Sequence, residues 1–286
     1  MIWLIPLLFV FFMMGVPITF SLGVASLIGL LLMDVPLLVI AQRLWTAVDT
    51  FTLVAVPLFI LAGELMSRGG ISRRLVDFAQ ALVGHFTSGL AMVAVVACMF
   101  FAAVSGSAVA DAAAIGGLLI PIMIANRYHP PFTASLVAAA GTIGPIIPPS
   151  IPMVLYGAMT NTSIAMLFAG GFLPGILMGF SLMAYSHYIG KQRGYRGREQ
   201  RATLAEVARG FTNAFLAMLM PLIIIGGIIS GVFTPTESGV VAVIYALILG
   251  LFVYRELAWR DLPGIFYETG LLVGKILFIL GTASIF

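Results

Sequence analysis

The sequence has few charged residues. Only 9% of its 286 residues are Asp, Glu, Lys or Arg, whereas 61% are hydrophobic and the mean hydropathy is +1.14. Soluble domains have about 25% charged and about 45–50% apolar residues. This composition excludes an ordinary water-soluble domain, so a lipid bilayer must be the main solvent of the chain.

Cysteine and histidine are also scarce. The single cysteine, Cys98, lies within an apolar stretch, so an intramolecular disulfide is excluded and a small buried hydrophobe is expected. The three histidines, His85, His129 and His187, lie far apart near segment ends, which argues against a metal site or a catalytic triad built from them. No Gly-x-x-x-x-Gly-Lys motif occurs, so ATP use is not indicated. The sequence therefore favours a protein that is not an enzyme.

Long apolar runs make up most of the chain instead. Several reach the roughly 18 residues that a membrane-spanning helix needs. One cleaved signal peptide cannot explain so many segments. The sequence therefore predicts an all-α polytopic membrane protein. The runs include residues 4–33, 133–147 with their continuation, 171–189 and 215–232.

Basic residues indicate the topology, because Lys and Arg concentrate in cytoplasmic loops. The net charge of +3 is interpreted in the same way and gives no indication of nucleic-acid binding. Residues 34–50 carry charges among apolar positions and are interpreted as an interfacial amphipathic helix. Four clusters are placed on the cytoplasmic side: Arg68 with Arg73 and Arg74; Arg127 within 126–131; Lys191, Arg193, Arg196, Arg198, Arg201 and Arg209; and Arg255 with Arg260.

Residues 85–126 leave one cytoplasmic cluster and return to the next. This length suits either a re-entrant hairpin or two spans. The centre, Ser105-Gly106-Ser107, is small and polar, which favours a hairpin whose tip lies at membrane depth. Close packing of helices through small residues is the alternative interpretation of this motif taken alone.

Residues 132–169 are too long for one untilted span and are interrupted by proline. Four prolines occur within 144–152, and each removes a backbone donor, so a continuous helix is implausible there. The segment is interpreted as a broken helix at mid-membrane. A structural kink or a surface loop is the alternative, although apolar sequence flanks the break on both sides.

The two interruptions predict one shared polar site, because non-helical backbone at membrane depth must be satisfied by protein or by a water-filled cavity. Carbonyls and hydroxyls freed at residues 105–107 and 144–150 suit a hard cation such as sodium, and half-helix N-termini suit an anion. Asp111 is a candidate functional residue because a carboxylate is costly inside a membrane. Its alternative role is a charge that favours the start of the second hairpin helix.

An internal repeat is indicated by an ungapped alignment of residues 15–32 with 231–248. The expected topology runs the first segment outward and the second inward, as in inverted-repeat transporters. With this 216-residue offset, the counterparts of Ser105 and Pro148 would lie near positions 321 and 364, so we expect a C-terminally truncated chain. The identities are Gly15/Gly231, Val16/Val232, Gly23/Gly239, Val24/Val240, Ile28/Ile244 and Leu31/Leu247.

Three segments resemble the large membrane subunit of tripartite ATP-independent periplasmic (TRAP) transporters. They are the run from Phe100 to Gly116 (FFAAVSGSAVADAAAIG), Ile147-Pro148-Pro149-Ser150-Ile151, and Thr234-Pro235-Thr236-Glu237. The resemblance covers essentially the whole chain, and the three segments together make it specific.

The resemblance implies an elevator-type secondary transporter with a scaffold and a moving transport domain. Such subunits import carboxylates such as C4-dicarboxylates or sialic acids with sodium. Their implied partners are a small four-helix membrane subunit and a periplasmic substrate-binding protein, in the bacterial inner membrane. Carried over by position, the first sodium site comprises Ser105, Gly106, Ser107, Gly144, Ile147 and Pro149, while Ser150 and Asp111 are assigned to substrate or gate.

These inferences divide the chain into four parts. Residues 1–84 form scaffold helices and the interfacial arm, and 85–170 form half of a transport domain, with the hairpin at about 85–126 and the broken helix at about 132–169. Residues 171–210 form a connecting helix and basic loop, and 211–286 begin the second repeat. Two other functions remain open: a carboxylate:sodium symporter without a binding protein, and an intramembrane enzyme.

Overall fold

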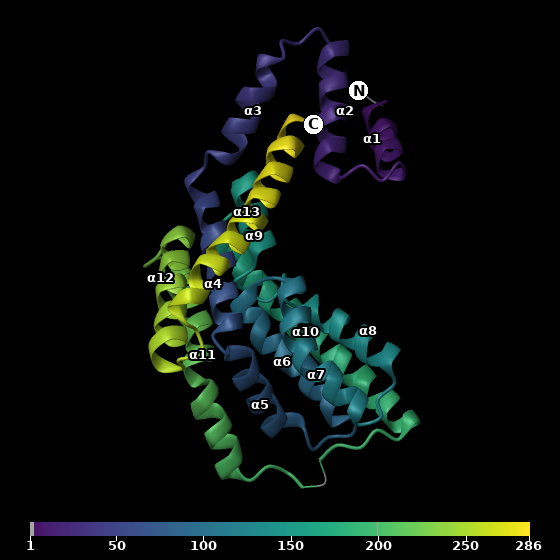
Figure 1. The fold of residues 1–286 in the computed structure, drawn as a ribbon, viewed down its shortest axis with the longest axis vertical. Coiled ribbons are helices and arrows are strands. Elements are labelled where there is room, and N and C mark those ends of the chain that lie inside the picture. The colour runs from purple at the N-terminus through teal and green to yellow at the C-terminus, as the bar shows by residue number, and fades with distance from the viewer. Residues whose placement is uncertain (1–2, 199) are drawn as a thin grey trace.

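A computed structural model describes residues 3–198 and 200–286, and these residues form helices joined by turns, with no strand among them (Figure 1). Six helical segments in this part of the chain are long and apolar enough to cross a membrane: Phe51–Arg68, Ala108–Ala125, Ile164–Arg193, Leu204–Ile229, Pro235–Val253 and Trp259–Ile285. The predicted all-α polytopic fold is therefore confirmed.

The N-terminal apolar run forms two helices and not one span. Helix α1 (Leu4–Met13) and helix α2 (Ile18–Leu32) are joined at Gly15, which adopts a φ of +75°. This left-handed conformation suits glycine, and Pro17 then fixes the start of α2. The apolar run at residues 4–33 is therefore divided into two helices. Helix α3 (Leu38–Val48) follows and packs on the last helix of the chain.

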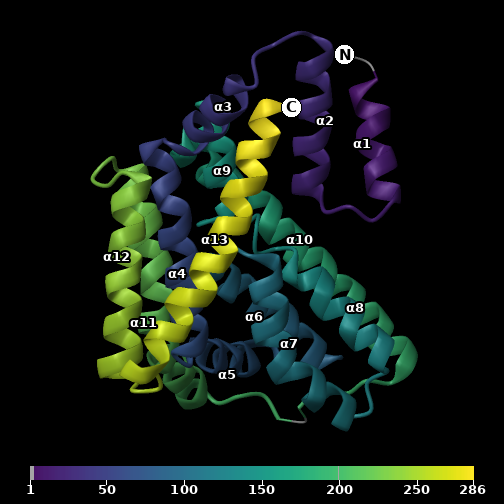
Figure 2. The same cartoon turned by 45° about the horizontal axis from the view of Figure 1, so that its top comes forward.

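A second group of helices forms one side of the molecule. Helix α4 (Ala55–Arg68) follows a 3₁₀ turn (Phe51–Val54), and α12 (Pro235–Ile248) packs along it before continuing as a π-helical turn (Leu249–Val253). Helix α11 (Leu204–Ile229) packs on α12, and α13 (Leu262–Ile285), after a 3₁₀ turn (Trp259–Asp261), crosses α4 (Figure 2).

The remaining helices surround a hairpin. Helix α5 (Ile71–Val83) leads into α6 (Gly89–Ser105), which turns directly into α7 (Ala108–Ala125). Helix α8 (Pro130–Gly141) packs on both hairpin helices, and α9 (Ile151–Thr160) precedes the long α10 (Ile164–Arg193). Most of α6 is buried, including the thiol of Cys98, so the hairpin's first helix forms the centre of this group.

One boundary differs from the sequence-based expectation. The second half of the broken helix ends at Thr160, because Asn161 adopts a φ of +54° and stops it, so residues 164–169 already belong to α10. Thr234-Pro235-Thr236-Glu237 forms the cap and first turn of α12. The aligned glycines of the internal repeat, Gly15 and Gly231, both adopt a φ of +75° between two helices.

Candidate functional site

The hairpin turns through a very short, buried segment. Helix α6 ends at Ser105, and Gly106 adopts a φ of +60°, a conformation in which glycine avoids the strain of a side chain. Ser107 is extended and caps α7, because its hydroxyl accepts a hydrogen bond from the Ala110 N–H at 3.4 Å. The polar, small tripeptide predicted as a hairpin tip therefore reverses the chain with only two non-helical residues.

The broken helix has a longer interruption. Helix α8 ends at Gly141, and residues 142–150 form turns before α9 begins. Ser150 accepts a hydrogen bond from the Met153 N–H at 3.3 Å and donates one to the Pro145 carbonyl at 2.6 Å, so one buried hydroxyl both caps α9 and holds the proline segment. The Pro148–Pro149 peptide bond is cis.

The structure brings the two interruptions into contact. A Cβ placed on Gly106 would lie 2.5 Å from the Pro149 carbonyl oxygen. A Cβ placed on Gly144 would lie 3.0 Å from the carbonyl carbon of Ser107. The first distance is too short for any side chain and the second is tighter than ordinary contact, so glycine at these two positions allows the two backbones to meet.

Asp111 is the charged residue at the contact between the two interruptions. Its side chain is fully buried, and one carboxylate oxygen, Oδ1, accepts a hydrogen bond from the Ser105 hydroxyl. The other, Oδ2, has no hydrogen-bond partner and would lie 2.6 Å from a Cβ on Gly144. The ion pairs found among residues 3–198 and 200–286 do not include Asp111. A buried carboxylate without a cation is costly.

The chemistry around this carboxylate fits a hard monovalent cation. The nearby groups are oxygens: the Ser105 hydroxyl, the Asp111 carboxylate and the carbonyls of the two interruptions. Ile147 can contribute only its main chain, because its side chain packs against Gly175 of α10. In the described part of the chain, no group of three or more His, Cys, Asp or Glu side chains is positioned to hold a metal.

A cavity of about 490 Å³ adjoins this point. The first turns of α7 and α9 both line it, together with Leu272 and Ile276 of α13 and Glu64 of α4. The two helix N-termini add partial positive charge to the cavity wall, and Glu64 adds a carboxylate.

The sequence did not reveal the role of α4 in this cavity. Glu64 lines the cavity, and Arg68 lies 3.8 Å from its carboxylate one turn later. The adjacent Gly63 is the sequence feature that could have indicated this role, because a Cβ there would lie 3.3 Å from the Ser105 carbonyl oxygen. Gly63, beside the acid Glu64, therefore allows α4 to approach the hairpin tip closely.

The fold and the site together define a class: a multi-pass, all-helical membrane protein in which a helical hairpin and a broken helix share one buried polar site. Residues 5–286 match the family described as "Tripartite ATP-independent periplasmic transporter, DctM component". The chain belongs to this family, and is therefore a multi-pass protein of the bacterial inner membrane.

Characterised relatives agree with this assignment. The chain is 41% identical to the isethionate TRAP transporter permease protein DctMQ of Oleidesulfovibrio alaskensis, over 99% of this chain and 45% of the relative. It is 44% identical to the sialic acid TRAP transporter large permease protein SiaM of Vibrio cholerae, over 89% and 60%. It is 42% identical to the C4-dicarboxylate TRAP transporter large permease protein DctM of Pseudomonas aeruginosa, over 86% and 58%. The chain thus spans about half to two-thirds of these relatives' lengths, and their names point to a transport role without enzymatic chemistry.

Proposed function

We propose that this chain forms part of a secondary transporter in which sodium binding at the hairpin drives the import of a small organic anion. The observation that carries the proposal is Asp111, a fully buried carboxylate that has a hydroxyl partner, Ser105, but no cation within the described residues. A sodium ion between this carboxylate and the carbonyls near Gly144 and Pro149 would neutralise it.

The same arrangement couples the cation to the anion. Asp111 lies in the first turn of α7, and the preceding residues of that turn line the 490 Å³ cavity. A cation that binds Asp111 and the proline break would hold the N-termini of α7 and α9 in position around the cavity. The anion site would then be formed fully only after the cation binds, which is a coupling free energy between two sites.

The substrate class follows from the cavity wall and from the relatives. Isethionate, sialic acid and C4-dicarboxylates, which the relatives' names specify, are all anionic at neutral pH. Two helix N-termini facing one cavity would bind such a group without a dedicated arginine. We infer a carboxylate or another small organic anion as the solute.

Family membership supports the remaining parts of the proposal. A tripartite system includes a small membrane subunit and a periplasmic binding protein. We infer that the anion is delivered by such a binding protein, and that the hairpin and the broken helix move together as part of an elevator-type transport domain. Co-purification with a small membrane subunit would support this proposal over a symporter that acts without a binding protein.

The experiment is uptake by the complete transporter, reconstituted with its membrane and periplasmic partners. A panel of labelled dicarboxylates, sugar acids and sulfonates is supplied outside, with an inward sodium gradient, a proton gradient or neither. We expect uptake of at least one anion with sodium only. Equal uptake with a proton gradient and no sodium would overturn sodium coupling.

Substitutions at the site give a second arm of the same experiment. Ser107→Ala removes the cap of α7, and Pro149→Ala relaxes the segment that contacts Gly106. Both are expected to raise the sodium concentration needed for half-maximal uptake. Unchanged sodium dependence in both variants would contradict the assignment of the cation to this point.

A further inference from the structure

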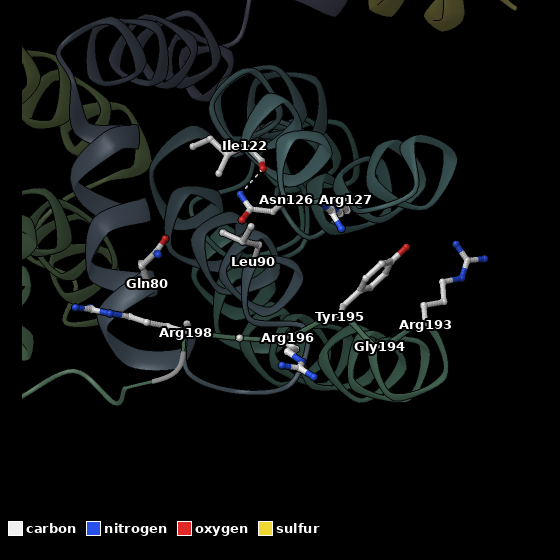
Figure 3. A pocket seen from close by; sticks show the side chains of 12 residues that line it. Gln80, Leu90, Ile122, Asn126, Arg127, Arg193, Gly194, Tyr195, Arg196 and Arg198 are labelled. Atoms are coloured by element: carbon white, nitrogen blue, oxygen red, sulfur yellow. Dashed lines mark hydrogen bonds between the residues drawn. The ribbon is translucent and has the colours of Figure 1, made fainter.

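A second cavity lies at the predicted cytoplasmic end of the hairpin group, far along α6 and α7 from the hairpin tip. It has a volume of about 680 Å³ and is open on one side. Its wall is formed where α5 and α7 end, where α6 begins, and where the chain leaves α10. Four arginines line it: Arg127, Arg193, Arg196 and Arg198. In Figure 3, Arg198 lies on the same side as Gln80, Arg193 lies opposite, and Arg127 and Arg196 lie between them.

The chain that carries three of these arginines is fixed to the helix ends. The Arg198 N–H donates to the Gly84 carbonyl at 2.9 Å, and the Ser88 N–H donates to the Tyr195 carbonyl at 3.1 Å. The Tyr195 ring stacks on Tyr128 with centroids 4.1 Å apart, and its hydroxyl accepts from the His129 N–H at 2.9 Å. These contacts hold the basic segment in one geometry, whereas an ordinary cytoplasmic loop only needs positive charge.

Among the described residues that line this cavity, positive charge exceeds negative charge. Among the residues that the structure describes, the one ion pair of these arginines joins Arg198 to Glu206 at 3.2 Å. Among residues 3–198 and 200–286, no acidic side chain lines the cavity. Leu90, in the first turn of α6, also contributes to the wall, so the positive end of that helix dipole adds to the field. A multiply hydrogen-bonded anion is the ligand class that such a wall selects.

A second, mainly apolar groove shares a lining residue with the basic cavity. Its volume is about 390 Å³, it is lined mainly by α8 and α10, and Arg193 belongs to the walls of both spaces. The groove extends along α8 from Phe132 to Ala139 and reaches Leu182 on α10. Seven residues of helix cover about 10 Å, which is enough for a substantial part of an acyl chain.

We propose that the two spaces together bind an anionic phospholipid, with the headgroup phosphate in the arginine cavity and an acyl chain in the groove between α8 and α10. Basic pockets between helices on the cytoplasmic side are suited to lipid phosphates. The lipid would tie the end of the hairpin to the end of α10, and so brace the helices that carry the candidate ion site.

The test is lipid binding to the purified, delipidated protein in detergent, followed by native mass spectrometry. Phosphatidylglycerol is the probe, phosphatidylcholine is the zwitterionic comparison, and inorganic phosphate is the headgroup anion without a chain. The cavity variant is Arg127→Gln with Arg196→Gln. The control variant, Arg201→Gln with Arg255→Gln, removes the same charge from residues outside the cavity wall. We expect phosphatidylglycerol to bind in preference to phosphatidylcholine, and the cavity variant to bind it about tenfold more weakly.

The groove has its own matched pair. Ser135→Trp fills it, whereas Ala134→Trp adds the same ring one position away, outside its wall. The first variant is expected to weaken binding of phosphatidylglycerol, and the second to leave it unchanged. Equal losses in the two arginine variants would overturn the proposal, as would equal binding of the two lipids. If inorganic phosphate alone displaced phosphatidylglycerol and Ser135→Trp had no effect, the site would be one for a free phosphate, and the lipid assignment would be wrong.

Discussion

The starts of α7 and α9 at the candidate site differ in one respect from the starts of α11 and α12. Thr203 of α11 and Thr234 of α12 each cap their helix together with a glutamate at the third helical position, whose carboxylate accepts from the cap's own N–H at 2.9 and 2.8 Å. Ser107 of α7 and Ser150 of α9 supply the same hydroxyl cap. Their third helical positions, however, are Ala110 and Met153, which have no carboxylate.

The same hydroxyl cap therefore occurs with a capping glutamate in one pair of helices and without it in the other. At the starts of α11 and α12, a glutamate in the helix supplies the negative charge that the N-terminus favours. At the site, the N-termini of α7 and α9 face a cavity and lack that glutamate, so they remain available to an anion from outside the chain. The acid of α7, Asp111, occurs one position later, which directs its carboxylate to Ser105 and Gly144 instead of to its own cap.

The largest effect is expected at Asp111, the acid that lies one position after the capping position of α7. Asp111→Asn keeps the shape of the side chain but removes the charge that a cation would neutralise. We expect sodium to raise the melting temperature of the parent protein and not that of the variant, because only binding to the folded state stabilises it. Sodium affinity in uptake should fall roughly ten- to a hundredfold. Asp77→Asn, at an exposed position of α5, is the control. Equal sodium stabilisation of both variants would show that Asp111 is not a ligand.

A slightly smaller effect is expected from filling the contact between the two interruptions. Gly144→Ala places a methyl group 2.6 Å from Asp111 Oδ2, so the carboxylate or the break must move. Overpacking of this kind costs about 1–3 kcal/mol, and we expect lost thermal stability together with weakened sodium dependence. Gly117→Ala on α7, where a Cβ meets nothing within 4 Å, is the matched control. It should be neutral or slightly stabilising. Loss of stability in the control alone would contradict the proposed contact.

Much of this site could be predicted from the sequence, and the reasons are local. The four prolines between 144 and 152 make a continuous helix implausible, so the second interruption follows from backbone chemistry. The tripeptide at 105–107 favoured an interruption, but its small residues taken alone also fitted close packing of helices. The position of Gly144 against Asp111 could not be predicted, because it depends on how α8 packs on the hairpin. The cavity wall from α4 and α13 depends in the same way on tertiary packing. The break at Gly15 was missed because an apolar run hides a single left-handed residue.

The third prediction adds to the site the capping glutamate that α11 and α12 have. Ala110→Glu gives α7 a carboxylate at its third position, where it can reach back to its own cap as Glu206 does. The anion would then compete with an internal carboxylate, so the KM for anion uptake should rise about tenfold. Ala110→Gln offers the same shape and a neutral cap, and should change the KM much less. If both variants raised the KM equally, bulk in the cavity and not charge would explain the effect.

The smallest effects are expected when the caps themselves are removed. The caps of α11 and α12 should then give a different result from the caps at the candidate site. Thr203→Ala and Thr234→Ala each lose one N-cap hydrogen bond, which costs about 1 kcal/mol. Because neither residue lines the 490 Å³ cavity, the melting temperature should fall slightly while the KM for the anion stays constant. Ser150→Ala loses a cap of similar strength, but it also frees the Pro145 carbonyl within the break, so thermal stability and the KM should change together. If the threonine variants shifted the KM as much as Ser150→Ala, the caps at the candidate site would not differ in function from the caps of α11 and α12.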